Sequence, residues 1–177
     1  MPQRLRLSPL KIDTRRVLFD ISRLYRNREH SFGTGIDRID LAIARELAGR
    51  FGENCRFIHV CYDGFAELPR KATQRLLDGL DARWHDGVGG PPLPATHVLR
   101  FGRLKSALGL FGDLNDCTYV VASHSGMPQR PGYLQRLDPA QKLRQIAFIH
   151  DIIPLEYPEY QTPWSRKVLR AYLADLA

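Results

Sequence analysis

Four short runs of mainly apolar residues, separated by longer periodic segments, determine the expected fold of this 177-residue chain. The runs cover residues 17–21, 56–62, 118–122 and 145–149. Strands that are covered on both faces of a parallel sheet have this nearly continuous apolar character, whereas half-exposed strands alternate apolar and polar residues. The pattern therefore predicts an α/β fold, with a Rossmann-like parallel sheet flanked by helices.

Apolar residues spaced three and four apart predict the helices. The first helix starts after Thr34, which forms an acidic capping box with Asp37, and its expected apolar face is Ile36, Ile39, Ile43, Leu47 and Phe51. A second helix is expected over residues 67–80, broken early by Pro69. A third has Thr162 as its N-cap and Pro163 as its first residue.

Other segments have weaker patterns. A basic arm over residues 1–15 precedes a single domain over residues 16–177, and a polar loop is expected over residues 23–32. Residues 86–94 are rich in Gly and Pro and predict a loop, 97–101 a short strand and 106–111 a short helix. The last helical pattern still runs at Ala177, which favours a chain cut from a longer protein.

Charge adds a preference for anionic partners. The net charge is +7, and the first thirty residues hold eight basic residues against three acidic ones. Such a flank fits an anionic membrane surface, a phosphorylated lipid or saccharide, or nucleic acid, although a plain solvated surface explains it equally well. Nucleic acid is not expected as a partner, because no recognition motif or interleaving of aromatic and basic residues is present.

Composition also bears on location and on cysteine chemistry. No apolar run is long enough for a membrane-spanning helix, and no secretory signal opens the chain, so a cytoplasmic location is expected, with attachment to the periphery of the inner membrane left open. The three cysteines are odd in number and lack zinc-site spacing, so neither a disulfide framework nor a metal site is expected. They are interpreted as core thiols: Cys55, Cys61 and Cys117.

Ligands of open parallel sheets bind beyond the carboxyl ends of the strands, so the loops that follow the strands are the candidate sites. The first loop ends in Gly33, Thr34 and Gly35 at a helix start, where backbone N–H groups favour an anion such as phosphate. Gly-x-Gly alone is not a dinucleotide or Walker pattern, so a plain turn and cap remains an alternative.

Two later loops carry further polar groups. Ser123 and His124 follow the third run and can hydrogen-bond a polyhydroxylated ligand, although serine and glycine are also ordinary turn residues. His150 and Asp151 follow the fourth run, ahead of a proline-stiffened aromatic loop. An imidazole followed by an acid that can orient it suits an active-site rim, although such pairs are often structural.

The string HDIIPLEYPEY at residues 150–160 resembles a segment of bacterial GT-B glycosyltransferases, in the retaining group that includes mannosyltransferases of surface-polysaccharide assembly. Residues 17–48 resemble the opening of the same group, in which a strand ending in Asp-x-Ser-Arg-Leu precedes a Gly-Ile-x-Arg helix start. The resemblance runs from about residue 16 to the end and is weak over residues 64–116. It implies the N-terminal, acceptor-side half of such an enzyme.

The resemblance also implies roles for individual residues. Gly33, Thr34 and Gly35 would meet the donor diphosphate, and His150, followed by Asp151, would position the transferred sugar as the catalytic pair. No metal or other cofactor is implied, because the nucleotide-sugar is a co-substrate. The acceptor, a saccharide or a lipid-linked sugar, would meet the surface formed by Arg23, Tyr25, Arg28, Arg38, Ser123, His124 and Tyr157.

The family's donor-binding domain, with its paired glutamates, is missing from these 177 residues, so this chain alone is expected to be inactive. The alternative from a different class is a non-catalytic α/β module that binds a phosphorylated ligand. That alternative explains the glycine loop and the charge, but gives the HDIIP string no purpose.

Overall fold

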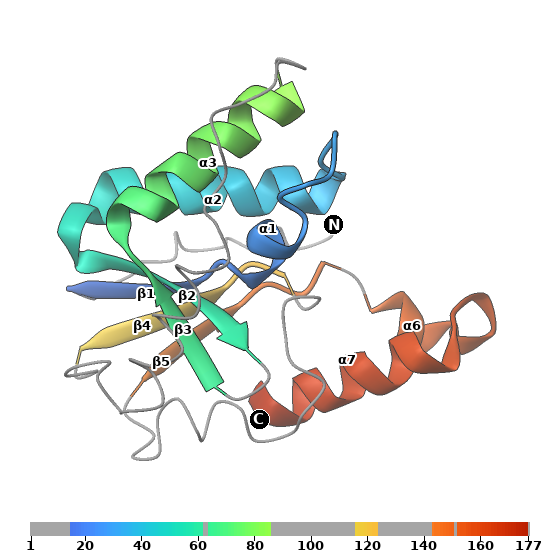
Figure 1. Ribbon diagram of the computed structural model, residues 1–177. Coiled ribbons are helices and arrows are strands. Elements are labelled where there is room, and N and C mark those ends of the chain that lie inside the picture. The colour runs from blue at the N-terminus through green and yellow to red at the C-terminus, as the bar shows by residue number, and fades with distance from the viewer. Residues whose placement is uncertain (1–14, 62–63, 86–115, 124–142, 151, 177) are drawn as a thin grey trace, which may run out of the picture.

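The computed structural model describes residues 15–61, 64–85, 116–123, 143–150 and 152–176 (Figure 1). The strands are β1 (Arg16–Asp20), β2 (Cys55–Cys61), β3 (Gly64–Leu68), β4 (Cys117–Val121) and β5 (Arg144–Ala147). The helices are α1 (Ser22–Arg26), α2 (Gly35–Phe51), α3 (Arg70–His85), α6 (Ile153–Glu156) and α7 (Pro163–Leu176). Two 3-10 turns complete the order, η1 (Gly52–Asn54) and η3 (Pro158–Tyr160).

The five strands form one mixed sheet in the order β3-β2-β1-β4-β5. Strand β1 is parallel to β2 and to β4, and β4 is parallel to β5. The predicted α/β class and Rossmann-like parallel sheet are confirmed for these four strands. The edge strand β3 is antiparallel to β2 and was not predicted.

The prediction of a helix over residues 67–80 is wrong at its start. Glu67 and Leu68 belong to β3, and α3 begins only after Pro69, whose carbonyl accepts the N–H of Thr73. Glu67 forms a bidentate ion pair with Arg56 of β2, which holds it in the sheet. The Nε of Arg56 lies 2.9 Å from the Oε1 of Glu67. Proline suits the turn before a helix, because it lacks the N–H that a helix interior requires.

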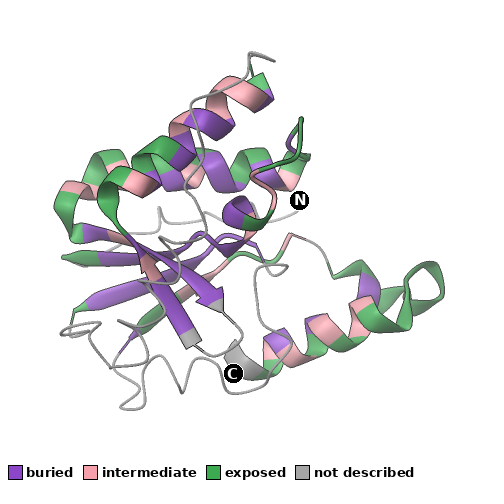
Figure 2. Cartoon of the chain, in the orientation of Figure 1, coloured by how far each residue is buried: buried purple, intermediate pink, exposed green. Residues whose placement is uncertain are grey.

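Helices α2 and α3 cover one face of the sheet and α7 covers the other (Figure 1). The first face holds a core that includes Phe19, Leu41 and Leu76, and the second packs Leu169 and Tyr172 of α7 against Leu18 and Tyr119. The central strands are therefore buried on both sides (Figure 2). This explains the nearly continuous apolar runs from which the strands were predicted.

Helix α2 begins at the predicted cap, and its predicted apolar face is confirmed in part: Leu47 is buried, and Ile43 and Phe51 pack against the core. Thr34 and Asp37 form the predicted capping box. The buried residues are Asp37, Asp40, Leu41, Ala44 and Leu47, whereas Ile39 is 47% exposed. The helix is turned so that two carboxylates, rather than Ile39, point inward at its start, where the polar groups of the sheet edge gather.

The structure confirms the predicted start of α7 and corrects the loop predicted after β1. The start of α7 is confirmed, since Thr162 Oγ1 accepts the N–H of Ser165 at 3.2 Å. The polar loop expected over residues 23–32 instead opens with helix α1. The predictions for residues 1–14, 86–94, 97–101, 106–111, His124 and Asp151 lie outside the described residues.

Two of the predicted core thiols are confirmed. Cys55 and Cys117 are buried and carry free thiols, and burial raises the pKa of Cys55 to about 12. The side chain of Cys61 lies outside the described part of the chain. Among the residues that the structure describes, no helix has the length and apolar character needed to cross a membrane.

Candidate functional site

The strand order reverses between β1 and β4, and this reversal defines the candidate site. The chain leaves β1 toward β2 on one side and leaves β4 toward β5 on the other. Where consecutive connections diverge in this way, the carboxyl ends of the two strands leave a crevice that ligands commonly occupy. The polar groups at this edge come from the end of β1, the start of α2, the end of β4 and the segment after β5.

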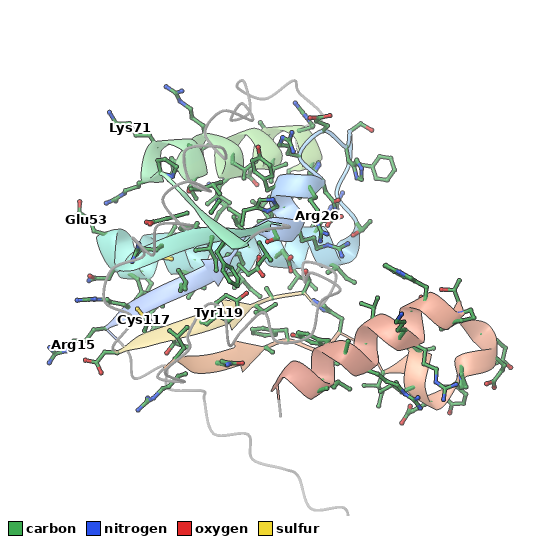
Figure 3. All side chains as sticks on the ribbon, turned by 60° about the horizontal axis from the view of Figure 1, so that its bottom comes forward. Arg15, Arg26, Glu53, Lys71, Cys117 and Tyr119 are labelled. Carbon is green, nitrogen blue, oxygen red and sulfur yellow. The ribbon has the colours of Figure 1, made fainter. Side chains whose placement is uncertain are left out.

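Asp20 lies at the base of this edge, at the end of β1, and is 5% exposed. Its Oδ1 accepts the N–H of Ser22 at 2.9 Å, and its Oδ2 accepts the hydroxyl of Tyr119 at 2.8 Å. Burial raises the pKa of Asp20, against the hydrogen bonds that lower it. The Asp20 carboxyl therefore links β1 to β4, the neighbouring strand that carries Tyr119 (Figure 3).

Asp37 anchors the start of α2. Its Oδ1 accepts hydrogen bonds from Arg23 Nε at 2.5 Å and Asn27 Nδ2 at 2.8 Å, and its Oδ2 accepts the Thr34 N–H at 2.9 Å and hydroxyl at 2.6 Å. Burial alone would raise the pKa of Asp37, but the hydrogen bonds from Thr34, Arg23 and Asn27 outweigh burial and lower it. The Asp37 carboxylate therefore fixes α1, the loop and α2 to one another.

Asp40 lies one turn further along α2 and is also buried, at 1% exposure. It hydrogen-bonds the side chain of Ser123, which follows β4. Among the described residues its Oδ1 has no hydrogen-bond partner. Burial raises the pKa of Asp40 to about 7, since the lowering effects of Ser123 and Arg23 are weaker. A buried carboxyl that lacks a partner for one oxygen is more stable as the neutral acid.

His150 is held against the end of β4. Its Nε2 lies 2.6 Å from the carbonyl oxygen of Ala122. Because a carbonyl oxygen only accepts, Nε2 carries a proton in this contact. The imidazole of His150 is thus oriented by backbone at the sheet edge where Ser123 also lies. Asp151, the predicted partner of His150, lies outside the described residues.

The two glycines predicted to meet a diphosphate have different surroundings. A Cβ on Gly33 would lie 2.6 Å from the ring of Trp84, so packing against α3 already explains this glycine. Gly35 is exposed, and a Cβ there would meet nothing within 4 Å. The Asp37 N–H is taken by Thr34 Oγ1, while the N–H groups of Gly35 and Ile36 have no acceptor within the helix. Gly35 marks the open part of the helix start.

The residues predicted to bind the acceptor have different surroundings. Tyr25 is buried, with its ring 4.9 Å from that of His59, and Arg28 stacks on Tyr25 and bonds its carbonyl oxygen. Arg38 is exposed and bonds the Trp84 carbonyl, and Tyr157 lies after α6. Arg23 and Ser123 do lie at the sheet edge, each bonded to a buried aspartate. His124 lies outside the described residues.

Sequence reasoning missed Asp20 and Asp40. A pattern was available for Asp40, because it lies four residues before Ala44 and seven before Leu47, on the phase that faces the core. An acid on that phase predicts a buried carboxyl. Asp20 was counted as part of an apolar strand, although an acid that ends such a run points to the sheet edge.

A hollow lies between α2 and α3, and none of the candidate-site residues lines it. It has a volume of about 370 Å³, and its lining includes Arg45, Arg70 and Gln74. These polar side chains are already paired, Arg45 with Asp81, Arg70 with Glu53 and Gln74 with Asp78. The sheet edge, with its oriented imidazole and open helix start, is therefore the stronger candidate site.

Neither a metal-binding cluster nor a known relative adds a further assignment. Within the described ranges, no three His, Cys, Asp or Glu side chains are grouped so that they could hold a metal ion. Comparisons with protein-family models, with curated proteins and with solved structures find no significant match.

The different space around Gly33 and Gly35 predicts different effects of alanine substitutions on the free energy of unfolding. Gly33→Ala forces its new methyl group against the Trp84 ring and is expected to lower the free energy of unfolding by about 1–3 kcal/mol. Gly35→Ala has room and is expected to change it by less than about 0.5 kcal/mol. Urea unfolding of both variants checks this, and equal losses would contradict the packing role of Gly33.

The burial of Asp40 predicts a pH-dependent stability. Its pKa rises from the ordinary aspartate value of 3.8 to about 7 on folding, so folding favours the protonated form and stability falls as pH rises through this window. Asp40→Asn removes this contribution, and at pH 8 it is expected to be more stable than the wild type by on the order of 2–4 kcal/mol.

Urea unfolding between pH 5 and pH 8 measures the effect of Asp40→Asn, with Glu46→Gln, an exposed site on the same helix, as the matched control. Asp20, whose pKa burial also raises, is present in both variants, and its charge is one of the causes that raise the pKa of Asp40. The assignment fails if the wild type and Asp40→Asn have the same dependence on pH.

Proposed function

We propose that this chain is the acceptor-side, N-terminal half of a nucleotide-sugar-dependent GT-B glycosyltransferase, completed by a donor-binding domain in the same polypeptide. One observation carries the proposal most strongly. The imidazole of His150, within the HDIIPLEYPEY string, is held by the end of β4 at the sheet edge where the strand order reverses. This position supports the proposal because ligands of open parallel sheets bind at such an edge.

The start of α2 supports binding of the donor. The N–H groups of Gly35 and Ile36 and the positive end of the 17-residue helix attract an anion, and the open space at Gly35 admits it. The Asp37 carboxylate already occupies the inner side of this helix start, but Arg23 offsets its charge. The donor diphosphate would therefore bind at the outer side of the helix start, with Thr34 and Gly33 shaping the loop behind it.

His150 has a positioning role in this proposal. It orients the transferred sugar, and Asp151 follows it in the motif. The bond between the anomeric carbon and the diphosphate breaks, the acceptor oxygen bonds to that carbon with retention, and the acceptor proton passes to the leaving diphosphate. The acceptor is a saccharide or lipid-linked sugar of cell-surface polysaccharide synthesis. The exposed Arg38 and the edge residues Arg23 and Ser123 are its nearest polar contacts among the described residues.

A non-catalytic module that binds a phosphorylated ligand is the second candidate. The open start of α2 favours it too, because this feature requires only an anion. The two candidates differ in what His150 does. In a binding module, replacing His150 leaves the affinity for phosphate unchanged, and no sugar is transferred.

The test uses the protein expressed from its whole reading frame and a panel of radiolabelled nucleotide-sugars with saccharide and lipid-linked acceptors. We expect transfer from at least one donor, and a reduction in turnover of about a hundredfold in His150→Ala with the melting temperature unchanged. His85→Ala, an exposed histidine that pairs with Asp81 on α3, is the matched control and keeps full activity.

Two results would reject the proposal. One is undiminished transfer in His150→Ala, and the other is a reading frame that encodes no second α/β domain with paired glutamates. Saturable phosphate binding without any transfer would support the binding module instead.

A further inference from the structure

The carboxyl of Asp40 is buried at the sheet edge without a full set of partners. Its side chain is 1% exposed, and it hydrogen-bonds Ser123, which follows β4. Within the part of the chain that the structure describes, its Oδ1 has no hydrogen-bond partner. A buried oxygen of this kind makes the ionised carboxyl costly, so the protonation of Asp40 responds to any further charge placed nearby.

The charged groups around Asp40 come from three elements. Asp37 precedes it on α2, Asp20 ends β1, and Arg23 belongs to α1. The two carboxylates raise the pKa of Asp40, whereas Arg23 lowers it. Arg23 already donates a hydrogen bond to Asp37 at 2.5 Å. The ionised form of Asp40 therefore adds a third carboxylate to an edge where Arg23 is already engaged.

Further titratable groups face the same edge from other elements. Arg26 of α1 lowers the pKa of Asp20, and Tyr119 of β4 donates its hydroxyl to the same carboxyl (Figure 3). Burial and the charge of Asp20 raise the pKa of Tyr172 on α7. His150 approaches from the segment after β5. Near pH 7 the two tyrosines stay neutral and the arginine stays charged, so the histidine and the aspartates are the groups whose charge can change.

The open start of α2 lies close to the buried acid. Gly35, the first residue of α2, precedes Asp40 by five residues, which is about 7.5 Å along the helix axis. An anion that accepts the N–H groups of Gly35 and Ile36 would not touch Asp40, because the Asp40 side chain is buried on the inner side of the helix. The two charges would still interact, since salt screens a buried charge only weakly.

We propose that the charge of Asp40 regulates the anion site at the start of α2: the site binds tightly while Asp40 is neutral, and binding of the anion draws a proton from the solvent onto Asp40. The two events are linked, because the anion and the ionised carboxyl repel each other across the same helix start. The regulation rests on the anion site of the proposed function. It would make the affinity for a nucleotide-sugar donor depend on pH near neutrality.

Sulfate is a suitable probe, because it keeps both of its charges throughout the pH range of the experiment. The 177-residue chain is titrated with sulfate at constant ionic strength between pH 5.5 and pH 8.5, and the amide chemical shifts of Gly35 and Ile36 report binding. We expect the dissociation constant of the wild type to rise about tenfold more over this range than that of Asp40→Asn, whose side chain stays neutral. Both proteins contain His150 and Asp20, so the comparison cancels effects that they share.

A second measurement needs no variant. The chemical shift of the Asp40 carboxyl carbon in the wild type gives the pKa of that group directly. Saturating sulfate should raise this pKa by about 1, because a tenfold linkage acts equally in both directions.

Glu46→Gln is the matched control for the removal of a negative charge from α2. Glu46 is exposed and lies further from the helix start than Asp40 does. This variant should bind sulfate within twofold of the wild type at each pH.

Three results would overturn the regulation, and they differ in what else they reject. Sulfate binding at Gly35 with the same pH dependence in the wild type and in Asp40→Asn rejects the linkage and leaves the anion site in place. An Asp40 pKa that sulfate does not change has the same meaning. The absence of sulfate-induced shifts at Gly35 and Ile36 at every pH rejects the linkage together with the donor site of the proposed function.

Discussion

The carboxylate of Asp37 is the interaction on which the candidate site depends. It is 1% exposed and joins four hydrogen-bond donors from α1, the following loop and the N-cap of α2. A buried carboxylate is stable only when such donors surround it, so the geometry of the loop is tightly constrained. Without this anchor, neither Arg23 nor the start of α2 would have a fixed place at the sheet edge.

The edge built on this anchor combines three buried acids with different surroundings. Asp37 is held ionised by its hydrogen bonds, Asp20 is paired but raised in pKa by burial, and Asp40 has no partner for its Oδ1 within the described part of the chain. Arg23 lies close to Asp37 and Asp40, and the charge of Arg26 acts on Asp20. These cations offset acidic charge at the edge, and the N–H groups at the start of α2 add an attraction for an anion.

Much of the fold could be predicted from the sequence, because strands buried on both faces and a helix with a side-chain cap leave local patterns. The central strands, the cap at Thr34 and the start of α7 are of this kind. Strand β3 was missed because its pairing depends on Arg56, eleven residues before Glu67. A contact across that distance leaves no periodicity. The inward position of Asp40 was missed for a different reason: its phase with Ala44 and Leu47 indicates burial, but the predicted apolar face placed Ile36 and Ile39 inward instead.

The most direct test of the account is a titration of the chain with a nucleoside diphosphate, followed through its backbone amide chemical shifts. The account predicts shifts at Gly35 and Ile36, at the open start of α2, and smaller shifts at Ser123 and His150. The amide of Thr34, bonded to Asp37, should change least within that loop. Shifts confined to the hollow between α2 and α3, around Gly49 and Gln74, with none at Gly35, would contradict it.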